Sequence, residues 1–275
     1  MNDRRSQMVI EVETLAAQEA QTVRILDCRF SLQDPNAPRT AFVAGHIPGA
    51  QFLDLETILS DHSIADRGRH PLPQPQHVVD HLAAMGVDKD SDIILYDDSF
   101  VAASARAWWM LNALEYRSVR ILNGGLQAWK QMGRAVNPGP GGNYPPVEPF
   151  AAPADWPTDW VINRDQIKAG AAGLLIDARE QPRFDGEVEP VDPVAGHIPG
   201  AVCMFFRGVC DERGMLKPDA AQRERWQGYP DDGSVVFYCG SGVTACINIF
   251  SWRLAGHHWP KLYPGGWSEW CRAEH

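Results

Sequence analysis

The chain has 275 residues, of which 44% are hydrophobic and 22% are charged, enough for one large core or two ordinary ones. Its formal net charge of -10 argues against nucleic acid or an anionic membrane as the main partner. No apolar run approaches the roughly 18 residues of a membrane span, and the N-terminal stretch lacks the apolar core of an export signal. We therefore expect a soluble protein of the cytoplasm.

Short β-branched runs alternate with helical patterns in the first half of the chain. In chain order these are a strand at 23–28, a helix around 77–86, a strand at 92–96, a helix at 102–114, a strand at 118–122 and a helix at 126–133. Such alternation is typical of a mainly parallel sheet covered by helices on both faces. The sequence therefore predicts an α/β fold. Residues 67–73, RGRHPLP, are interpreted as a solvated turn, with a place beside a cleft as the alternative.

Proline and glycine are dense in residues 136–157, which excludes a continuous helix or a central strand there. We interpret this stretch as an extended, semi-rigid linker. The boundaries that follow are a first domain over 1–136, a linker over 137–157 and a second domain over 158–275.

The second half of the chain repeats the features of the first half in the same order. The seven residues AGHIPGA occur at 44–50 and again at 195–201, and a GG-x-x-x-W pattern closes each half at 124–129 and 265–270. The chain is therefore interpreted as a tandem duplication of two domains, because each copy is long enough to bury its own core.

Six cysteines occur at irregular spacing, and neither a Cys-x-x-Cys pair nor a His-x-x-x-His pair lies near them. This pattern favours reduced thiols over disulfides or a zinc site. We expect no metal and no organic cofactor, so any chemistry would come from one activated thiolate. The six are Cys28, Cys203, Cys210, Cys239, Cys246 and Cys271.

Cys239 is the candidate nucleophile. It follows the strand-like run VVFY, and a Gly-Ser-Gly loop and a helix beginning near Val243 come after it. Ligands of parallel sheets gather beyond the carboxyl ends of the strands. The loop N–H groups and the helix terminus could together lower the pKa of the thiol, whose free value is about 8.5. The alternative is a buried, inert cysteine.

Two comparisons sharpen this prediction. The first copy has Asp97 where the second has Cys239, so we expect the first copy to be non-catalytic. A cysteine phosphatase needs an arginine six residues after the cysteine, and Ala245 stands there, which argues against phosphatase chemistry.

The motif aromatic-x3-His-aliphatic-Pro-Gly-Ala at Phe42–Ala50 and the ending YPGGWSEW at Tyr263–Trp270 resemble the two-domain sulfurtransferases of the rhodanese superfamily. The resemblance covers nearly the whole chain. It implies tandem rhodanese-like α/β domains, each a mainly parallel sheet flanked by helices. It also implies that Cys239 accepts a sulfur atom as a persulfide and passes it to a thiophilic acceptor, such as cyanide, a small thiol or thioredoxin.

Within the superfamily, the mercaptopyruvate-type enzymes carry CGSGVTA, which matches residues 239–245, whereas thiosulfate-type enzymes place basic residues after the cysteine. The resemblance therefore implies 3-mercaptopyruvate as donor and pyruvate as product. It assigns a proton relay to Ser241 and His46, with Asp34 as the nearest candidate acid, and substrate binding to the rest of the loop. The loop residues are Gly240, Gly242, Val243 and Thr244.

Arg183 matches the first carboxylate-binding arginine of the family. The second, expected shortly before GHIPGA, is absent, and Asp192 lies near its place. Three explanations stay open: another arginine reaches the site, thiosulfate is the donor, or the donor is a different compound. A non-catalytic tandem module that binds a partner or carries sulfur is the competing class.

Overall fold

The structure is a computed structural model that describes residues 3–18, 22–98 and 100–273. The chain forms two compact units, each assembled from three segments. The first unit comprises Met1–Leu59, Pro73–Asp155 and Cys210–Leu216, and the second comprises Ser60–Leu72, Trp156–Val209 and Lys217–His275. The units therefore differ from contiguous halves, because one short segment of each half belongs to the unit built mainly from the other half.

The first unit contains a five-stranded sheet in the order β1-β5-β4-β2-β3, and every described pairing in it is parallel. Its strands are β1 (Val9–Ile10), β2 (Val23–Asp27), β3 (Gln51–Phe52), β4 (Asp92–Tyr96) and β5 (Ser118–Leu122). Its helices are α1 (Asp3–Met8), α2 (Val12–Ala16), α3 (Ala37–Ala44), α4 (Pro75–Ala84), α5 (Ala102–Ala113) and α6 (Gly125–Gln131).

The second unit contains a four-stranded parallel sheet in the order β7-β6-β8-β9. Its strands are β6 (Leu175–Asp177), β7 (Val202–Cys203), β8 (Val236–Tyr238) and β9 (Lys261–Leu262). Its helices are α7 (Arg164–Lys168), α8 (Gln181–Phe184), the 3-10 turn η1 (Phe206–Val209), α9 (Asp219–Arg225), α10 (Ala245–Ala255) and α11 (Gly266–Ala273).

The two sheets repeat one topology, which confirms the predicted α/β class. The order β5-β4-β2-β3 of the first unit corresponds to β9-β8-β6-β7 of the second. The place of β1 is taken in the second unit by a single parallel bridge between Val161 and Leu262. The duplication seen in the sequence is therefore a duplication of sheet topology as well.

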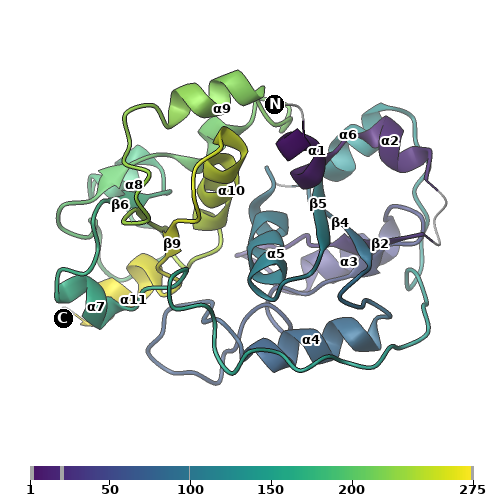
Figure 1. The fold of residues 1–275 in the computed structure, drawn as a ribbon, viewed down its shortest axis with the longest axis horizontal. Helices are drawn as coiled ribbons and strands as arrows, with labels where there is room; N and C mark the ends of the chain where they lie inside the picture. The colour runs from purple at the N-terminus through teal and green to yellow at the C-terminus, as the bar shows by residue number, and fades with distance from the viewer. Residues whose placement is uncertain (1–2, 19–21, 99, 274–275) are drawn as a thin grey trace. The chain divides into compact units, whose positions relative to one another are not determined.

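The central helix of each unit is buried along most of its surface. Helix α5 contacts β4 and β5, and α10 contacts β8 and α9; all of these except β8 are labelled in Figure 1. A helix that is buried on all sides is typical of a packed core, and the polar side chains of these helices, such as Arg106 and Asn248, are buried with the rest. Since α10 follows the Cys239 loop directly, this burial fixes the loop at its helical end. None of the described helices is long and apolar enough to cross a bilayer.

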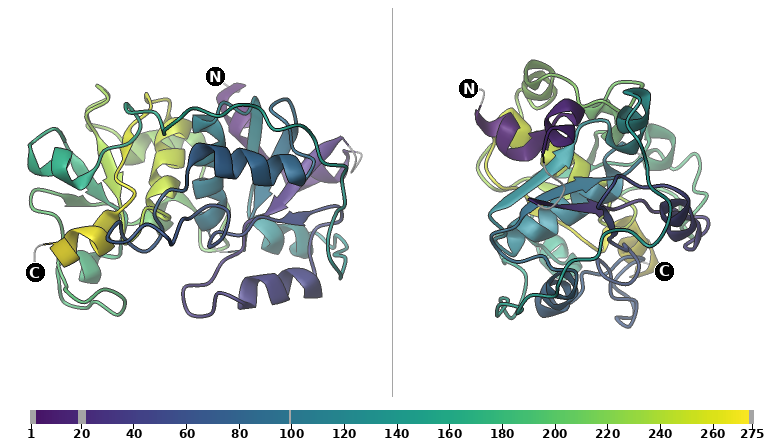
Figure 2. Two further views of the ribbon diagram at one scale, coloured as in Figure 1. Left: turned by 90° about the horizontal axis from the view of Figure 1, so that it is seen from below. Right: turned by 90° about the vertical axis from the view of Figure 1, so that its right-hand side faces the viewer.

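The proline-rich segment that the sequence suggests as a linker packs on the first unit. Its N–H groups find carbonyl partners there: Gly142 donates to Ala50 at 2.8 Å and Val147 donates to Ala83 of α4 at 2.9 Å. Figures 1 and 2 show this segment passing α4 as an extended strand-like trace. Because these backbone groups are satisfied within one unit, the segment up to residue 155 is part of that unit.

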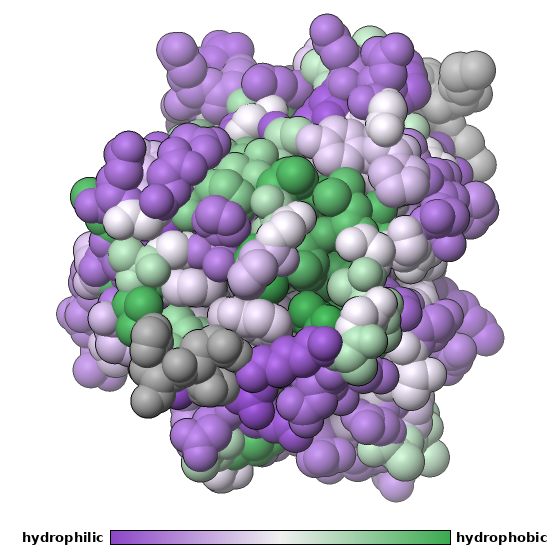
Figure 3. All heavy atoms as spheres, turned by 90° about the vertical axis from the view of Figure 1, so that its left-hand side faces the viewer, coloured by the Kyte–Doolittle hydropathy of each residue, from purple (hydrophilic) through white to green (hydrophobic). Residues whose placement is uncertain are grey.

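Apolar side chains gather in the middle of the face drawn in Figure 3, and hydrophilic side chains frame them. The second unit has a cavity of about 470 Å³ whose lining includes Ile167, Leu175, Ile198 and Trp270. Lys168 is the one ionisable side chain of that lining, which holds neither a nucleophile nor an acid, so this cavity is not where chemistry is expected.

Candidate active site

Cys239 lies directly after β8, at the carboxyl edge of the second sheet, and is 2% exposed. The loop after it turns at Gly242, whose φ is +73°. A Cβ at Gly242 would lie 2.5 Å from the Pro264 carbonyl oxygen, so both the backbone conformation and the space require glycine. Helix α10 begins at Ala245, two residues later than the sequence suggests. The predicted nest of N–H donors around the sulfur stays a prediction.

The C-terminal motif holds the cysteine loop in place. The N–H of Trp267 donates to the Cys239 carbonyl oxygen at 2.8 Å, and the N–H of Ser268 donates to the Gly240 carbonyl oxygen at 2.9 Å. A Cβ at Gly266 would come within 2.5 Å of the Cys239 carbonyl oxygen, so the two backbones meet at a distance that only glycine permits. The YPGGWSEW ending is therefore a support for the loop.

Ser241 forms a hydrogen bond with a histidine of the segment 60–72, which belongs to the second unit. Ser241 Oγ lies 2.7 Å from His70 Nδ1, and the two residues are 5% and 3% exposed. The segment is anchored on the C-terminal motif: the N–H of Arg69 donates to Ser268 Oγ at 3.1 Å, and a Cβ at Gly68 would lie 2.5 Å from the Gly265 carbonyl oxygen. The solvated turn suggested for residues 67–73 is thus wrong for His70.

The sequence analysis assigned His46 to the relay with Ser241, but the histidine that is hydrogen-bonded to Ser241 is His70. His46 is 2% exposed, its Nδ1 lies 2.8 Å from the Phe42 carbonyl oxygen, and its ring stacks on Phe42 with centroids 4.2 Å apart. His197 repeats this arrangement on Phe184, with Nδ1 2.7 Å from the carbonyl oxygen. The histidine of GHIPGA therefore fixes a turn in both copies, which explains why it occurs twice.

Asp34, the candidate acid suggested from the sequence, belongs to the first unit. Its Oδ1 accepts the N–H of Asn36 at 2.9 Å in an exposed turn of the first unit. A comparison of the two copies could have pointed to His70. The pair Arg-Gly at 67–68 recurs at 213–214. Arg-His follows it in the first copy, whereas Met-Leu follows it in the second.

Two guanidinium groups meet beside the cysteine loop. A Cβ at Gly240 would lie 2.5 Å from Arg69 Nη2 and 3.8 Å from Arg183 Nη2. Arg69 was not among the residues expected from the sequence, whereas Arg183 was. Both arginines belong to the second unit, so the residue next to Cys239 faces two cationic groups.

Buried carboxylates orient these arginines. Asp192 Oδ1 accepts a hydrogen bond from Arg69 Nη1, and its Oδ2 lies 3.6 Å from Arg183 Nη2. Glu189 Oε1 accepts from Arg183 Nη2 at 2.6 Å. Burial would raise the pKa of Glu189, but the hydrogen bond from Arg183 and the N–H groups of residues 191 and 192 outweigh it and leave that pKa below its usual value.

The contacts of Arg179 are structural. Its guanidinium binds Asp177 at 2.7 Å and donates to the Gly196 carbonyl oxygen at 2.6 Å. Arg29 makes the same two contacts in the first unit, with Asp27 at 2.7 Å and the Gly45 carbonyl oxygen at 3.0 Å. An arrangement present in both copies cannot be what distinguishes the catalytic one.

All six cysteines are free thiols. Burial raises the pKa of Cys203 to about 11, and burial also raises the pKa values of Cys28 and Cys271. Cys246 Sγ donates to the Gly242 carbonyl oxygen at 3.4 Å and is fully buried. These four thiols are therefore poor nucleophiles where they lie. No group of three or more His, Cys, Asp or Glu that could hold a metal occurs in residues 3–18, 22–98 and 100–273.

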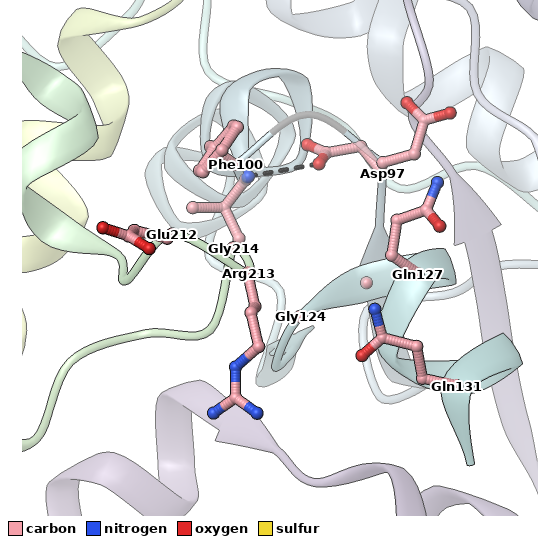
Figure 4. A pocket seen from close by; sticks show the side chains of 11 residues that line it. Asp97, Phe100, Gly124, Gln127, Gln131, Glu212, Arg213 and Gly214 are labelled. Carbon is pink, nitrogen blue, oxygen red and sulfur yellow. Dashed lines mark hydrogen bonds between the residues drawn. The ribbon is translucent and has the colours of Figure 1, made fainter.

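In the matching loop of the first unit, Asp97 stands in the place that Cys239 has in the second unit. Asp97 Oδ1 accepts the N–H of Val101 at 3.1 Å, the bond drawn as a dashed line in Figure 4. Asp97 Oδ2 accepts both the N–H of Ser104 at 3.0 Å and its hydroxyl at 2.7 Å. The hydrogen bonds of this carboxylate therefore connect its own loop to α5. A cavity of about 340 Å³ adjoins it, lined on one side by Gln127 and Gln131 and on the other by Glu212 and Arg213.

Residues 11–132 and 159–273 match the rhodanese-like domain family. The chain belongs to the rhodanese family. A probable 3-mercaptopyruvate sulfurtransferase of Pseudomonas aeruginosa is 44% identical over 96% of this chain and 95% of its own length. A putative thiosulfate sulfurtransferase of Mycobacterium tuberculosis is 39% identical over 97% and 94%. The structure of 3-mercaptopyruvate sulfurtransferase from Leishmania major is similar with a TM-score of 0.85 and 31% identity, covering 97% of this chain and 75% of that one.

These similarities make the chain a two-domain rhodanese sulfurtransferase, close to the mercaptopyruvate enzymes. They confirm the prediction of an enzyme that transfers sulfur and set aside the non-catalytic tandem module considered from the sequence.

Proposed function

We propose that this rhodanese takes the sulfur of 3-mercaptopyruvate onto Cys239 as a persulfide, releases pyruvate, and passes the sulfur to a thiophilic acceptor. The observation that carries the proposal is the hydrogen bond of 2.7 Å between Ser241 Oγ and His70 Nδ1. Ser241 lies two residues after the cysteine. A buried hydroxyl that is hydrogen-bonded to an imidazole can both donate and accept a proton, which is what the leaving enolate of this reaction would need.

In the first half-reaction, the Cys239 thiolate attacks the sulfur of the donor. A bond forms between the two sulfur atoms, the bond from the donor sulfur to its methylene carbon breaks, and that electron pair moves to the carbonyl as a pyruvate enolate. The Ser241 hydroxyl would donate a hydrogen bond to the enolate oxygen, which requires His70 Nδ1 to carry the proton that Ser241 Oγ accepts. Protonation of the enolate carbon gives pyruvate.

In the second half-reaction, a nucleophile attacks the outer sulfur of the persulfide and leaves the Cys239 thiolate. Cyanide would leave as thiocyanate, and a small thiol would leave as a persulfide. Reduced thioredoxin would first take the sulfur as a persulfide, and its second thiol would then close the disulfide and release the sulfur as hydrogen sulfide. Asp34 and His46 have no part in this scheme, because their described contacts lie within turns of the first unit.

Thiosulfate is the second candidate donor. The convergence of Arg69 and Arg183 beside Gly240 favours it, since two guanidinium groups can bind a dianion. One of the relatives is named as a putative thiosulfate sulfurtransferase. The two donors differ in what they leave behind, pyruvate or sulfite, so product analysis separates them.

The test is cyanide-dependent turnover with each donor, with Cys239→Ser as the blank. We expect kcat/KM to be higher for 3-mercaptopyruvate, and intact mass after donor treatment to rise by one sulfur atom in the wild type alone. A higher kcat/KM for thiosulfate would establish the second candidate. Absence of both turnover and added sulfur would refute the persulfide on Cys239.

A further inference from the structure

We infer that Glu269 is a positioning residue of the active site: its carboxylate holds residues 67–70 on the C-terminal motif and thereby sets the His70 imidazole against Ser241. The inference rests on the proposed function, in which the pair of Ser241 and His70 serves the enolate. Glu269 would act through His70 and not on the donor itself.

The carboxyl group of Glu269 packs against the turn on which residues 67–70 rest. Glu269 lies in α11 and is 5% exposed. A Cβ at Gly265 would collide with Glu269 Oε2, so this oxygen occupies the space that a side chain at Gly265 would take. The same glycine meets the other segment, because a Cβ at Gly68 would lie 2.5 Å from the Gly265 carbonyl oxygen. The carboxyl group and the segment that carries His70 therefore share one contact point, Gly265.

Ser268 continues this contact to the neighbour of His70. Its Oγ donates to the Gly265 carbonyl oxygen at 3.0 Å and accepts the N–H of Arg69 at 3.1 Å. His70 follows directly and forms its hydrogen bond of 2.7 Å with Ser241. Hydrogen bonds weaken steeply when their length or angle changes, so a small displacement at Gly265 would disturb the Ser241–His70 pair.

Arg67 joins the same segment to the carboxylate directly. Its Nη1 lies 4.0 Å from Glu269 Oε1, and the two side chains are 58% and 5% exposed. The carboxylate is therefore the buried end of an ion pair whose other end lies three residues before His70. An exposed arginine at that distance adds little to stability, but it draws the segment toward Glu269 only while Glu269 is ionised.

Burial raises the pKa of Glu269, because the charged form is poorly solvated in this place. The Tyr263 hydroxyl and two cations, Arg164 of α7 and Arg67, oppose this shift without cancelling it. Asp165 of α7 adds to the shift. An apolar side chain of similar size would fill the space without the penalty of a buried charge. Packing alone therefore does not account for a glutamate at this position.

The first repeat seats its corresponding segment with apolar groups instead. Aligned at their double glycines, the repeats place Ala128 opposite Glu269. Gly124 stands opposite Gly265, and a Cβ there would collide with Met215 Sδ. Met215, from the segment that the second half of the chain supplies to the first unit, thus lies where the Glu269 carboxylate lies in the second unit. Seating a segment on the double glycine does not require a carboxylate, and the unit that has one is the unit with the nucleophile.

The test is the single-turnover rate of persulfide formation from 3-mercaptopyruvate in the full-length enzyme. Glu269→Gln keeps the shape of the side chain and removes its charge, and it should lower this rate about 10-fold, because His70 is no longer held against Ser241. Glu224→Gln is the matched control, since Glu224 is exposed on α9, and it should leave the rate unchanged. An unchanged rate in Glu269→Gln would overturn the inference.

The same substitution in His70→Gln separates positioning from general support of the fold. If Glu269 acts through His70, Glu269→Gln should change the residual rate of His70→Gln by less than about twofold. A further loss of about 10-fold in the double variant would show that Glu269 supports the site independently of His70, and the inference would be wrong.

The pH dependence provides a second readout. Protonation of Glu269 in the wild type gives the neutral group that Glu269→Gln mimics, so the two rates should converge in acid. Because the pKa of Glu269 lies above its ordinary value of 4.5, the ratio of wild type to variant at pH 4.5 should be about half or less of its value at about pH 8. An equal ratio at both pH values would mean that the charge has no role, contrary to the inference.

Arg67→Gln decides if Glu269→Gln does not fold, because Arg67 is largely exposed and the buried carboxyl group stays in place. It should lower the rate about threefold, and this loss should vanish in His70→Gln. No loss, or a loss that persists in His70→Gln, would refute the positioning role. A wild type that gains no sulfur on Cys239 refutes the proposed function itself, whereas a wild type that gains it, with Glu269→Gln at full rate, refutes the positioning role alone.

Discussion

Ser241 Oγ and His70 Nδ1 lie 2.7 Å apart although 171 positions separate them in the chain. His70→Gln should lower kcat with 3-mercaptopyruvate on the order of 100-fold, because the hydroxyl loses the group that holds and supplies its proton. KM should change little, and the single-turnover rate of persulfide formation on Cys239 is the measurement that checks this.

His46→Gln is the matched control for that variant. It removes a buried ring that binds Phe42, so we expect a lower melting temperature but an unchanged kcat per folded molecule. A large loss of kcat in His46→Gln together with an active His70→Gln would reverse the assignment of the relay.

The turn at Gly242 should be intolerant of alanine. Gly242→Ala combines a left-handed backbone with a collision at Pro264, and we expect a loss of about 1 to 3 kcal/mol in the free energy of unfolding, with a misplaced Cys239 loop. Gly233→Ala has the same positive φ, +77°, and open space around its Cβ, so it should lose only about 1 kcal/mol. Urea unfolding of both variants measures the difference, and equal losses would show that the collision at Pro264 is relieved without cost.

The first unit should not gain chemistry from a cysteine. Asp97→Cys removes a carboxylate that accepts three hydrogen bonds from Val101 and Ser104, so we expect a loss of about 2 kcal/mol or more in stability. Intact mass after donor treatment should still show one added sulfur. Two added sulfurs would mean that the loop of the first unit can also activate a thiol. Asp97→Asn keeps the shape and serves as the control for the loss of charge.

Acid should weaken the anchor of Arg183. Because the pKa of Glu189 is lowered in the folded protein, its contribution to stability is present above the unfolded value, near 4.5, and is lost as the pH falls through the lower folded value. As the pH is lowered below 4.5, the melting temperature of the wild type should therefore fall more steeply than the melting temperature of Glu189→Gln. Parallel curves for the two proteins would contradict the ion pair.

The parallel sheets follow from local patterns, which is why they could be predicted. The runs at 92–96 and 118–122 form β4 and β5 with the expected bounds: β4 is buried at four of its five positions, whereas in β5 half-buried Ser118 and Arg120 alternate with buried residues. Cys239 could be placed at a sheet edge for the same reason. The strand before Cys239 and the turn and helix after it are all encoded by residues next to it in the sequence.

The partners of the cysteine loop could not be found in this way. Whether residues 67–70 stay in solvent or reach Ser241 depends on contacts with Gly265 and Ser268, about 200 positions away, which no local pattern encodes. The histidine of GHIPGA was favoured because its motif is conspicuous. A motif present in both copies, however, is evidence for a shared structural role, and the residues that differ between the copies carry the chemistry.

The segment 60–72 lies in the first half of the chain but belongs to the unit that contains Cys239. A gene fragment that encodes only residues 158–275 would therefore supply Cys239 and Ser241 without the His70 imidazole that is hydrogen-bonded to Ser241. The two repeats have become mutually dependent parts of one enzyme. The first half, which has Asp97 in place of a cysteine, supplies segment 60–72 to the unit of Cys239, and the second half supplies segment 210–216 to the other unit.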